Sequence, residues 1–467
     1  MNKKNILTSY VEGITNTVHG ESYSRIVRYF IPEFITNLIV YSMPLWLDAI
    51  FIASLKSTST YATLGATNNI IHLGIKVAEA LSVSTVVLSG YYNGQKDYQK
   101  VGDTVRDSFW ITCLFGIFFF IVLYFYGQQI YHWYGVSPEI AALGVPYLRI
   151  RALGVLFMFI YFAFVGFLRG IKNTTSPMKI FIFGALVFVI TDYVLIFGKY
   201  GFTAYGLQGS AMATLLQYVT MTIVAVCYVL FNRKNRKYGV NLFSIFTSHH
   251  QIKRFMHVSW PIVLDKATLA IAYIWLGKMI APLGTNAIAA FSAIKDMERF
   301  AFLPAIACAH VITFLVSNNI GAQDITAVKI NIKKVLLLAG AMVSSILFLM
   351  TMFTSQVLYL FDKQGDFTIL VMQVFPVISV LVLFDLLQLV LSGALRGTGN
   401  VHTVMMVRLV VVFLFFIPIS YIFARYIDVS ESWRIILIYG SFYIGNAIMS
   451  IFYVQRFRSN QWKNLTI

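Results

Sequence analysis

The sequence predicts an all-α polytopic membrane protein with twelve transmembrane helices in two six-helix lobes. Composition is the first observation behind this prediction. Of the 467 residues, 58% are hydrophobic and only 12% are charged, and the mean hydropathy is +0.74. A soluble protein is roughly 45–50% apolar and about 25% charged. The composition therefore excludes a soluble domain.

An internal repeat is the second observation. GFLRGIKN, which begins at Gly166, matches GALRGTGN, which begins at Gly393, and YYNGQKD from Tyr91 matches NNIGAQD from Asn318. Both pairs are 227 residues apart. Two matches in one register indicate a duplication. Because each copy carries an even number of spans, we expect the two lobes to be related by a pseudo-two-fold axis along the membrane normal.

Apolar runs long enough to cross a hydrocarbon core of ~30 Å recur along the chain. Pro32 and Pro44 fall in the first run and are expected to kink its helix. The twelve predicted spans cover about 28–55, 65–91, 108–127, 143–167, 178–198, 207–231, 257–281, 292–318, 333–360, 370–394, 404–426 and 433–456.

Lys and Arg residues cluster in every second connection between these spans, which predicts that both termini are cytoplasmic. The net charge of +17 is therefore interpreted as membrane orientation, and no nucleic-acid partner is expected. The predicted domains are an N-terminal tail (1–24), an N-lobe (25–231), a basic linker (232–256), a C-lobe (257–458) and a C-terminal tail (459–467).

Three aspartates fall inside or beside apolar spans: Asp48 in the first, Asp192 in the fifth and Asp385 in the tenth. An ionisable group at mid-membrane costs about 2.5–3.5 kcal/mol on insertion scales, so it usually faces a partner or a hydrated cavity. We interpret these aspartates as functional. An interfacial position stays an alternative for Asp48.

The seventh and eighth spans contain Asp265 and Glu298 among several basic residues. Two interpretations stay open, an ion network between helices and the wall of a hydrated cavity that would include Asp265, Asp385 and Glu298. Aromatic side chains in the proposed walls can hold a flat organic cation by cation–π contacts, with ordinary helix packing as the alternative. These aromatic residues are Tyr41, Trp46, Tyr193, Tyr273 and Trp275.

Motifs in order along the chain resemble the multidrug and toxic compound extrusion (MATE) family, part of the MOP flippase superfamily. They are WLDAIF, GYYNGQKDYQKV, YLRIRALG, GFLRGIKNTTSPM and ITDYVLIFGKYGF in the first half, and WPIVLDK, SNNIGAQD and FDLLQLVLSGALRGTGN in the second. The resemblance covers nearly all of the chain. It implies an antiporter with two lobes around a central cavity. It also assigns cation coupling to Asp48, Asp192 and Thr214.

The sequence departs from the family pattern at two positions. Phe188 stands where many members have an asparagine, four residues before the fifth-span aspartate. Leu269 stands where many have an acidic residue, with Asp265 one turn earlier. These departures leave open which ion, H⁺ or Na⁺, is coupled and which lobe binds it.

The predicted function is export of organic cations or amphiphilic compounds across the cell (inner) membrane in exchange for H⁺ or Na⁺. We expect a monomer without cofactor or metal. The first alternative is a flippase for a lipid-linked precursor, in which Lys266, Lys278, Lys295 and Arg299 would bind phosphate. A membrane-embedded enzyme is less consistent with the sequence because the eight histidines form no metal-spaced or catalytic pattern. A channel lacks a filter-like motif.

Overall fold

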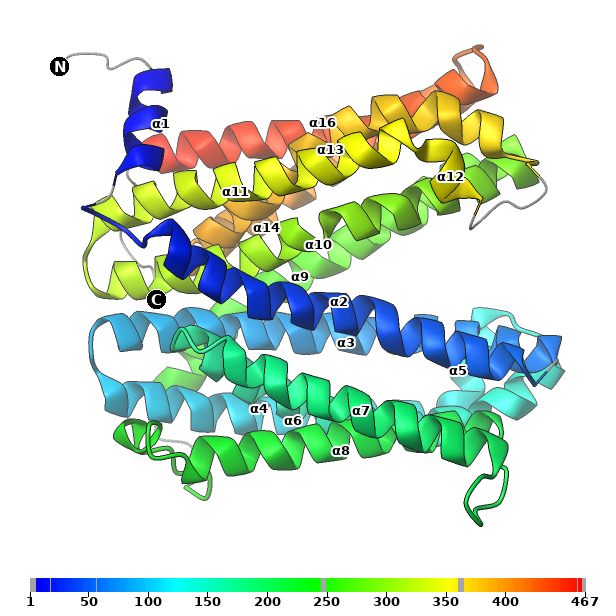
Figure 1. The fold of residues 1–467 in the computed structure, drawn as a ribbon, viewed down its shortest axis with the longest axis horizontal. Helices are drawn as coiled ribbons and strands as arrows, with labels where there is room; N and C mark the ends of the chain where they lie inside the picture. The colour runs from blue at the N-terminus through cyan, green and yellow to red at the C-terminus, as the bar shows by residue number, and fades with distance from the viewer. Residues whose placement is uncertain are drawn as a thin grey trace. The chain divides into compact units, whose positions relative to one another are not determined.

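The computed structural model describes residues 6–16, 18–55, 57–244, 249–359, 365–459 and 461–463. In these ranges the side chains of 6–9, 40–49, 53, 58 and 249–250 are not described. Every regular element in the described part of the chain is a helix (Figure 1). The predicted all-α class is therefore confirmed.

The long helices account for all twelve predicted spans. Ten of the described helices are long and apolar enough to cross a membrane, and α2 and α9, with 31 and 32 residues, supply the other two spans. The twelve are α2 (Tyr23–Ala53), α3 (Thr58–Gly94), α4 (Tyr98–Phe125), α6 (Pro138–Gly170), α7 (Thr175–Phe197), α8 (Leu207–Phe231), α9 (His249–Ile280), α10 (Thr285–Gly321), α11 (Ile325–Met352), α13 (Thr368–Gly397), the run of α14 (Val401–Val411), the π-helix η3 (Val412–Phe416) and α15 (Ile417–Arg425), and α16 (Glu431–Arg458). Short helices are α1 (Ile6–Thr15), α5 (Gly127–Tyr134), α12 (Thr354–Leu358), η1 (Arg236–Tyr238) and η2 (Ala281–Leu283).

The chain divides into two compact units. The N-lobe unit runs from Ile31 to Val263, and the C-lobe unit joins the residues up to Phe30 with those from Leu264 onward. Both divisions fall inside a helix, α2 in one case and α9 in the other, each near a proline (Pro32 and Pro261). The lobe boundaries predicted from the sequence lie in the polar connections, and they stay a prediction.

The repeated glycine–arginine motifs bring corresponding helices into close contact within each unit. A Cβ added at Gly166 of α6 would lie 2.6 Å from the backbone oxygen of Ser82 on α3. A Cβ added at Gly393 of α13 would lie 2.9 Å from the backbone oxygen of Ala309 on α10. Only glycine permits this approach of two backbones. The two motifs thus have the same packing role in both units.

The segment before the first long helix packs on the C-lobe unit. Helix α1 contacts α11, and the Tyr10 hydroxyl donates to the carbonyl oxygen of Lys333 at 3.2 Å. The backbone N–H of Glu21 donates to Asn331 Oδ1 at 2.8 Å, and Lys334 Nζ donates to the Glu21 carbonyl at 2.9 Å. The region predicted as a polar tail therefore contains a helix bound to α11.

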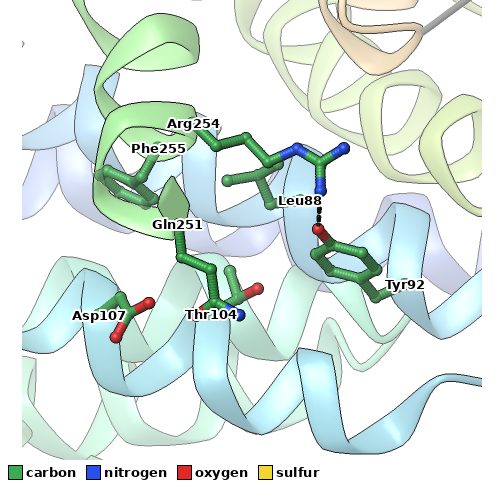
Figure 2. A pocket seen from close by; sticks show the side chains of 7 residues that line it. All are labelled: Leu88, Tyr92, Thr104, Asp107, Gln251, Arg254 and Phe255. Carbon is green, nitrogen blue, oxygen red and sulfur yellow. Dashed lines mark hydrogen bonds between the residues drawn. The ribbon is translucent and has the colours of Figure 1, made fainter. Parts of the chain in front are cut away.

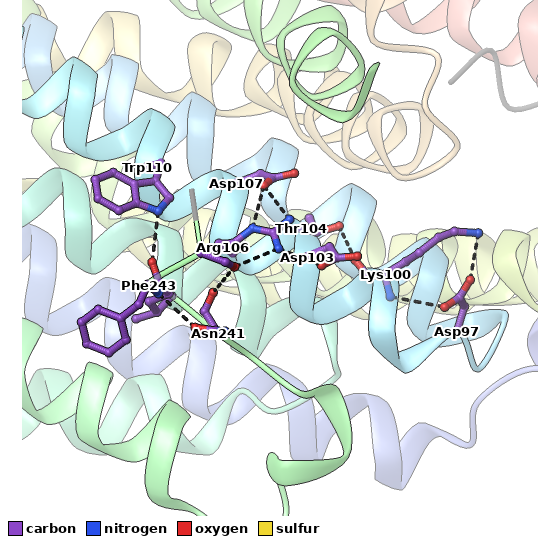
Figure 3. A network of polar contacts seen from close by, with 11 residues as sticks. Asp97, Lys100, Asp103, Thr104, Arg106, Asp107, Trp110, Asn241 and Phe243 are labelled. Atoms are coloured by element: carbon purple, nitrogen blue, oxygen red, sulfur yellow. Dashed lines mark hydrogen bonds and ion pairs between the residues drawn. The ribbon is translucent and has the colours of Figure 1, made fainter. Parts of the chain in front are cut away.

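The connection after α8 packs on the N-lobe unit in a comparable way. Helix η1 lies on α4 so closely that a Cβ at Gly102 would be 2.0 Å from the Tyr238 carbonyl oxygen. Figure 3 shows Trp110, whose Nε1 donates to the Leu242 carbonyl at 3.1 Å, beside the polar network of α4. In that network Arg106 pairs with Asp103 at 3.1 Å and Asp107 at 3.0 Å. The described part of the predicted linker, up to residue 244, is thus fixed to this unit.

Candidate functional site

The predicted coupling residues of the N-lobe unit lie on α2, α7 and α8. Asp192 of α7 is fully buried, and Thr214 of α8 is 8% exposed. The side chains of Asp48, Tyr41 and Trp46 lie outside the described residues, so their predicted roles stay predictions.

The Thr214 hydroxyl contacts the guanidinium group of Arg151. Arg151 Nη1, from α6, donates to Thr214 Oγ1 at 3.1 Å, and its Nη2 donates to Asn68 Oδ1 of α3 at 3.3 Å. The guanidinium carbon also lies 5.7 Å from the ring centre of Tyr147. Nothing in the sequence singles out Arg151, because its contacts join three helices that are far apart in the chain.

The arginines of the two repeated motifs each bind an acidic residue of the first long helix of their own unit. Arg169 of α6 pairs with Glu33 of α2, with Nε–Oε1 and Nη2–Oε2 distances of 2.8 and 2.7 Å. Arg396 of α13 pairs with Asp265 of α9 at 2.6 Å. Such pairs fix orientation as well as charge.

Asp265 lies in a closed ion cluster of the C-lobe unit. Its Oδ2 binds Arg396 and its Oδ1 binds Arg408 of α14, and all three residues are at most 7% exposed. The prediction grouped Asp265 with the acids of a hydrated cavity wall. The structure places it in an ion network between helices, because two arginines from α13 and α14 reach its carboxylate.

Glu298 has different surroundings in the same unit. It is 6% exposed, and its Oε2 accepts hydrogen bonds from the hydroxyls of Tyr439 and Tyr443 on α16, the second at 2.7 Å. Its Oε1 has no hydrogen-bond partner among the described residues. The bonded partners of this carboxyl are therefore neutral phenols.

Asp385 of α13 also has a neutral partner. The side-chain amide of Asn446 on α16 donates to its Oδ1 at 2.9 Å. Asp385 is partly buried, and it interacts electrostatically with the Glu298 carboxyl and with the Arg408 guanidinium. Tyr273 of α9 interacts with both acids. We call Glu298, Asp385, Tyr439, Tyr443 and Asn446 the acidic cluster of the C-lobe unit.

The described aromatic candidates all contact neighbouring side chains. Tyr193 packs against Phe51 and Phe197 with ring centres 6.0 and 5.3 Å apart, and it is 42% exposed. Tyr273 packs against Phe442 at 5.2 Å. Trp275 donates from Nε1 to Ser420 Oγ at 2.9 Å. These contacts establish packing for each residue, and their role toward a ligand stays a prediction.

Three basic residues of α9 and α10 have partners within the C-lobe unit. Lys278 lies 5.7 Å from the ring centre of Trp275, and Lys295 lies 5.9 Å from that of Phe291. Arg299 lies 3.9 Å from Asp296. Lys266 also interacts with another residue. The flippase alternative concerns these four residues, because a phosphate-bearing lipid would need cations available to bind it.

A small polar pocket lies elsewhere, where the start of α9 meets α3 and α4 (Figure 2). In it the Arg254 guanidinium donates to the Tyr92 hydroxyl. None of its residues was predicted to be functional. The pocket is lined by Leu88, Tyr92, Thr104, Asp107, Gln251, Arg254 and Phe255. Among the described residues, no three His, Cys, Asp or Glu side chains gather as a metal site would require.

Known proteins resemble this chain along most of its length. "Multidrug resistance protein NorM" of Photobacterium profundum is 22% identical over 84% of this chain and 85% of its own length. "Probable multidrug resistance protein NorM" of Mannheimia succiniciproducens is 24% identical over 72% of each chain.

Solved structures show the same fold. "Crystal structure of MATE in the straight conformation" superposes with a TM-score of 0.84, at 20% identity, over 96% of this chain and 98% of that one. An "outward-facing conformation of a multidrug resistance MATE family transporter of the MOP superfamily" gives a TM-score of 0.83 at 20% identity, over 96% and 97%. The repeat also appears in the family comparison, where the MatE model matches residues 32–194 and again 261–422. The chain therefore belongs to the MatE family, whose members are multi-pass membrane transporters and not enzymes.

Proposed function

We propose that this transporter is a secondary active antiporter, which exports organic cations or amphiphilic compounds while H⁺ or Na⁺ moves inward by alternating access. Membership of the MatE family and the names of the relatives support export of such compounds. The residues that carry the exchange are proposed from the buried acids of the two units.

The acidic cluster of the C-lobe unit is the observation that carries this proposal. Asp265 is neutralised by two arginines, whereas Glu298 and Asp385 are hydrogen-bonded to neutral phenol and amide groups. A carboxylate held in a low-dielectric interior by neutral groups is costly. Glu298 and Asp385 are therefore suited to bind either a proton or a positively charged substrate.

Competition at such acids provides the exchange. If a proton or Na⁺ and a cationic substrate bind to the same groups, their binding free energies are linked, and each displaces the other. The membrane potential favours inward movement of the coupling ion by about 2.3 kcal/mol per charge per 100 mV. In this proposal Glu298 and Asp385 bind either the coupling ion or the exported cation, in turn, and Asp48, Asp192 and Thr214 respond to the coupling ion in the N-lobe unit.

The test is uptake of a cationic dye into everted vesicles energised by respiration. We expect Glu298→Gln and Asp385→Asn each to lower dye transport about 10-fold or more, because each removes one of two proposed cation partners. Asp296→Asn is the matched control, since Asp296 lies on the same helix as Glu298 but is half exposed.

Two results would contradict the proposal. One is transport at the wild-type rate in both acid variants at equal expression. The other is movement of a fluorescent anionic lipid analogue, but not of the dye, which would favour the flippase alternative.

A further inference from the structure

The Arg151 guanidinium lies in a polar cluster built by three helices of the N-lobe unit. We call Asn68 of α3, Tyr147 and Arg151 of α6, and Thr214 of α8 the Arg151 cluster. Arg151 donates to the side-chain oxygens of the other three, at 3.3 Å to Asn68, 3.3 Å to Tyr147 and 3.1 Å to Thr214. Five donors in a rigid fork suit a guanidinium to bind several oxygens at once.

Close packing of α6 and α8 explains why Arg151 reaches Thr214. Gly154 is one turn after Arg151, and a Cβ added there would lie 3.6 Å from the Cα of Leu215, the residue after Thr214. Helices α6 and α8 are thus close to van der Waals contact at this level. Arg151 can thus contact the threonine hydroxyl directly.

These hydrogen bonds occupy the Thr214 hydroxyl. Its hydrogen is donated to the carbonyl oxygen of Ser210 at 3.1 Å, and its oxygen accepts from Arg151. A metal cation bound to that oxygen would lie beside the guanidinium, and like charges at such a distance repel strongly away from water. Thr214 is therefore a poor ligand for Na⁺ while Arg151 is in place.

On α7, the buried face that carries Asp192 adds no second oxygen ligand at the position one turn earlier. Phe188, one turn before Asp192, is 2% exposed and carries only hydrocarbon. Hard metal cations are bound by several oxygen ligands at once. A proton needs only one carboxylate oxygen.

We propose that Arg151 is the resident cation of this cluster, that it excludes a metal cation from Thr214, and that the coupling ion is H⁺ and not Na⁺. This inference rests on the proposed antiport. One proton binds a carboxylate oxygen of Asp192 from the outside and is released to the cytoplasm, so that no ligand shell has to form or break.

Other titratable groups lie around the Arg151 cluster and act on its electrostatics. Tyr131 of α5 and Tyr218 of α8 interact electrostatically with Arg151. Glu79 of α3, which acts on Tyr218, is paired with Lys76 at 3.0 Å. Helix α7, which packs on α8, contributes Asp192. The side chains of α2 at this level, residues 40–49, are not described.

The test uses the full-length protein in proteoliposomes with ethidium as the substrate and the membrane potential held at zero by valinomycin. A pH gradient and a Na⁺ gradient of equal size are imposed separately. In the wild type we expect the pH gradient to drive ethidium transport and the Na⁺ gradient to have no effect. In Arg151→Met we expect Na⁺ to change the transport rate by about 10-fold, within the usual range for coupled ligands.

Two variants separate this role from a loss of folding. Arg149→Met removes an exposed arginine two residues away, which contacts Tyr124, and should keep the wild-type ion preference. Arg151→Lys keeps the charge and should stay insensitive to Na⁺, even if its rate falls.

The outcomes distinguish this inference from the proposed function. Transport driven by Na⁺ in the wild type would overturn the inference but leave the antiport intact. Dye transport driven by neither gradient would overturn the antiport as well. Insensitivity to Na⁺ in Arg151→Met, with transport still measurable, would overturn the role of Arg151.

Discussion

At the residue scale, the buried acids of the C-lobe unit differ in the groups that bind them. Asp265 has two arginines, whereas Glu298 has two tyrosine hydroxyls. A buried ion pair is stable because each charge compensates the other, so its members are poorly suited to exchange ions. Phenols donate hydrogen bonds without adding charge. The same residue type can thus be structural in one place and a candidate for function in the other.

Replacing Asp265 with Asn tests the structural role of the first acid. The change leaves Arg396 and Arg408 buried without their carboxylate, which typically costs about 3–5 kcal/mol. We expect a clear fall in the thermal unfolding temperature of the detergent-solubilised protein, measured by a thiol-reactive dye on its cysteines. Asp428→Asn, at an exposed pair with Arg434, is the control and should change little. Equal stability of the two variants would contradict this role.

Glycines at helix contacts matter at the scale of the element. Gly397 of α13 is so close to α10 that an added Cβ would lie 2.5 Å from the Thr313 carbonyl oxygen. The same helix carries Asp385 and Arg396, so this contact positions two residues of interest. Gly340 of α11, in contrast, has open space around it.

Substitution of these two glycines gives a second prediction. Gly397→Val forces α13 away from α10 and should lower both expression and unfolding temperature, since overpacking typically costs about 1–3 kcal/mol. Gly340→Val should leave both close to the wild-type values. The measurement is fluorescence-detected size-exclusion chromatography after heating. An unchanged profile for Gly397→Val would mean that the two helices separate without cost.

The contact of η1 with α4 leads to a third prediction. A side chain at Gly102 would occupy the position of the Tyr238 carbonyl oxygen. We expect Gly102→Val to detach residues 236–244 and to increase their amide hydrogen exchange, because backbone groups held by packing become open to water. Gly65→Val on α3, where a Cβ meets nothing within 4 Å, is the control. Exchange that stays slow in Gly102→Val would exclude this packing role.

The duplication explains a shared arrangement at the scale of the whole molecule. Asn331 and Lys334 of α11 bind the segment around Glu21, and the residues 227 positions earlier, Thr104 and Asp107 of α4, line the pocket with the start of α9. Equivalent positions of α11 and α4 thus contact the residues just before one long helix, α2, and the first turns of another, α9. A segment held in this way is part of its unit rather than a free connection.

Membrane orientation is the fourth prediction. The basic connections predict cytoplasmic positions for both termini and for the segment after α8. In a cysteine-free background, Lys234→Cys should be labelled by an impermeant maleimide only after the membrane is opened, and Lys199→Cys should be labelled in intact cells. Both side chains are exposed. The opposite labelling pattern would reverse the orientation.

Composition and periodicity were enough to predict several features of this protein. The helical class and the spans follow from apolar length, because a bilayer accepts only segments that satisfy their own backbone hydrogen bonds. The duplication follows from motifs in register. Even Tyr439, Tyr443 and Asn446 show a pattern that was overlooked, since they recur at i, i+4 and i+7 on one face of a helix.

Only the tertiary structure decided which charges are paired. Arg408 reaches Asp265 from 143 residues away, and Arg151 reaches Thr214 from 63 residues away. Hydropathy is a property of each segment taken alone, whereas neutralisation of a buried charge depends on which segments pack together. The sequence therefore determined where the acids lie along the chain. The packing of helices determined that Asp265 is paired with two arginines, while Glu298 and Asp385 have neutral hydrogen-bond partners.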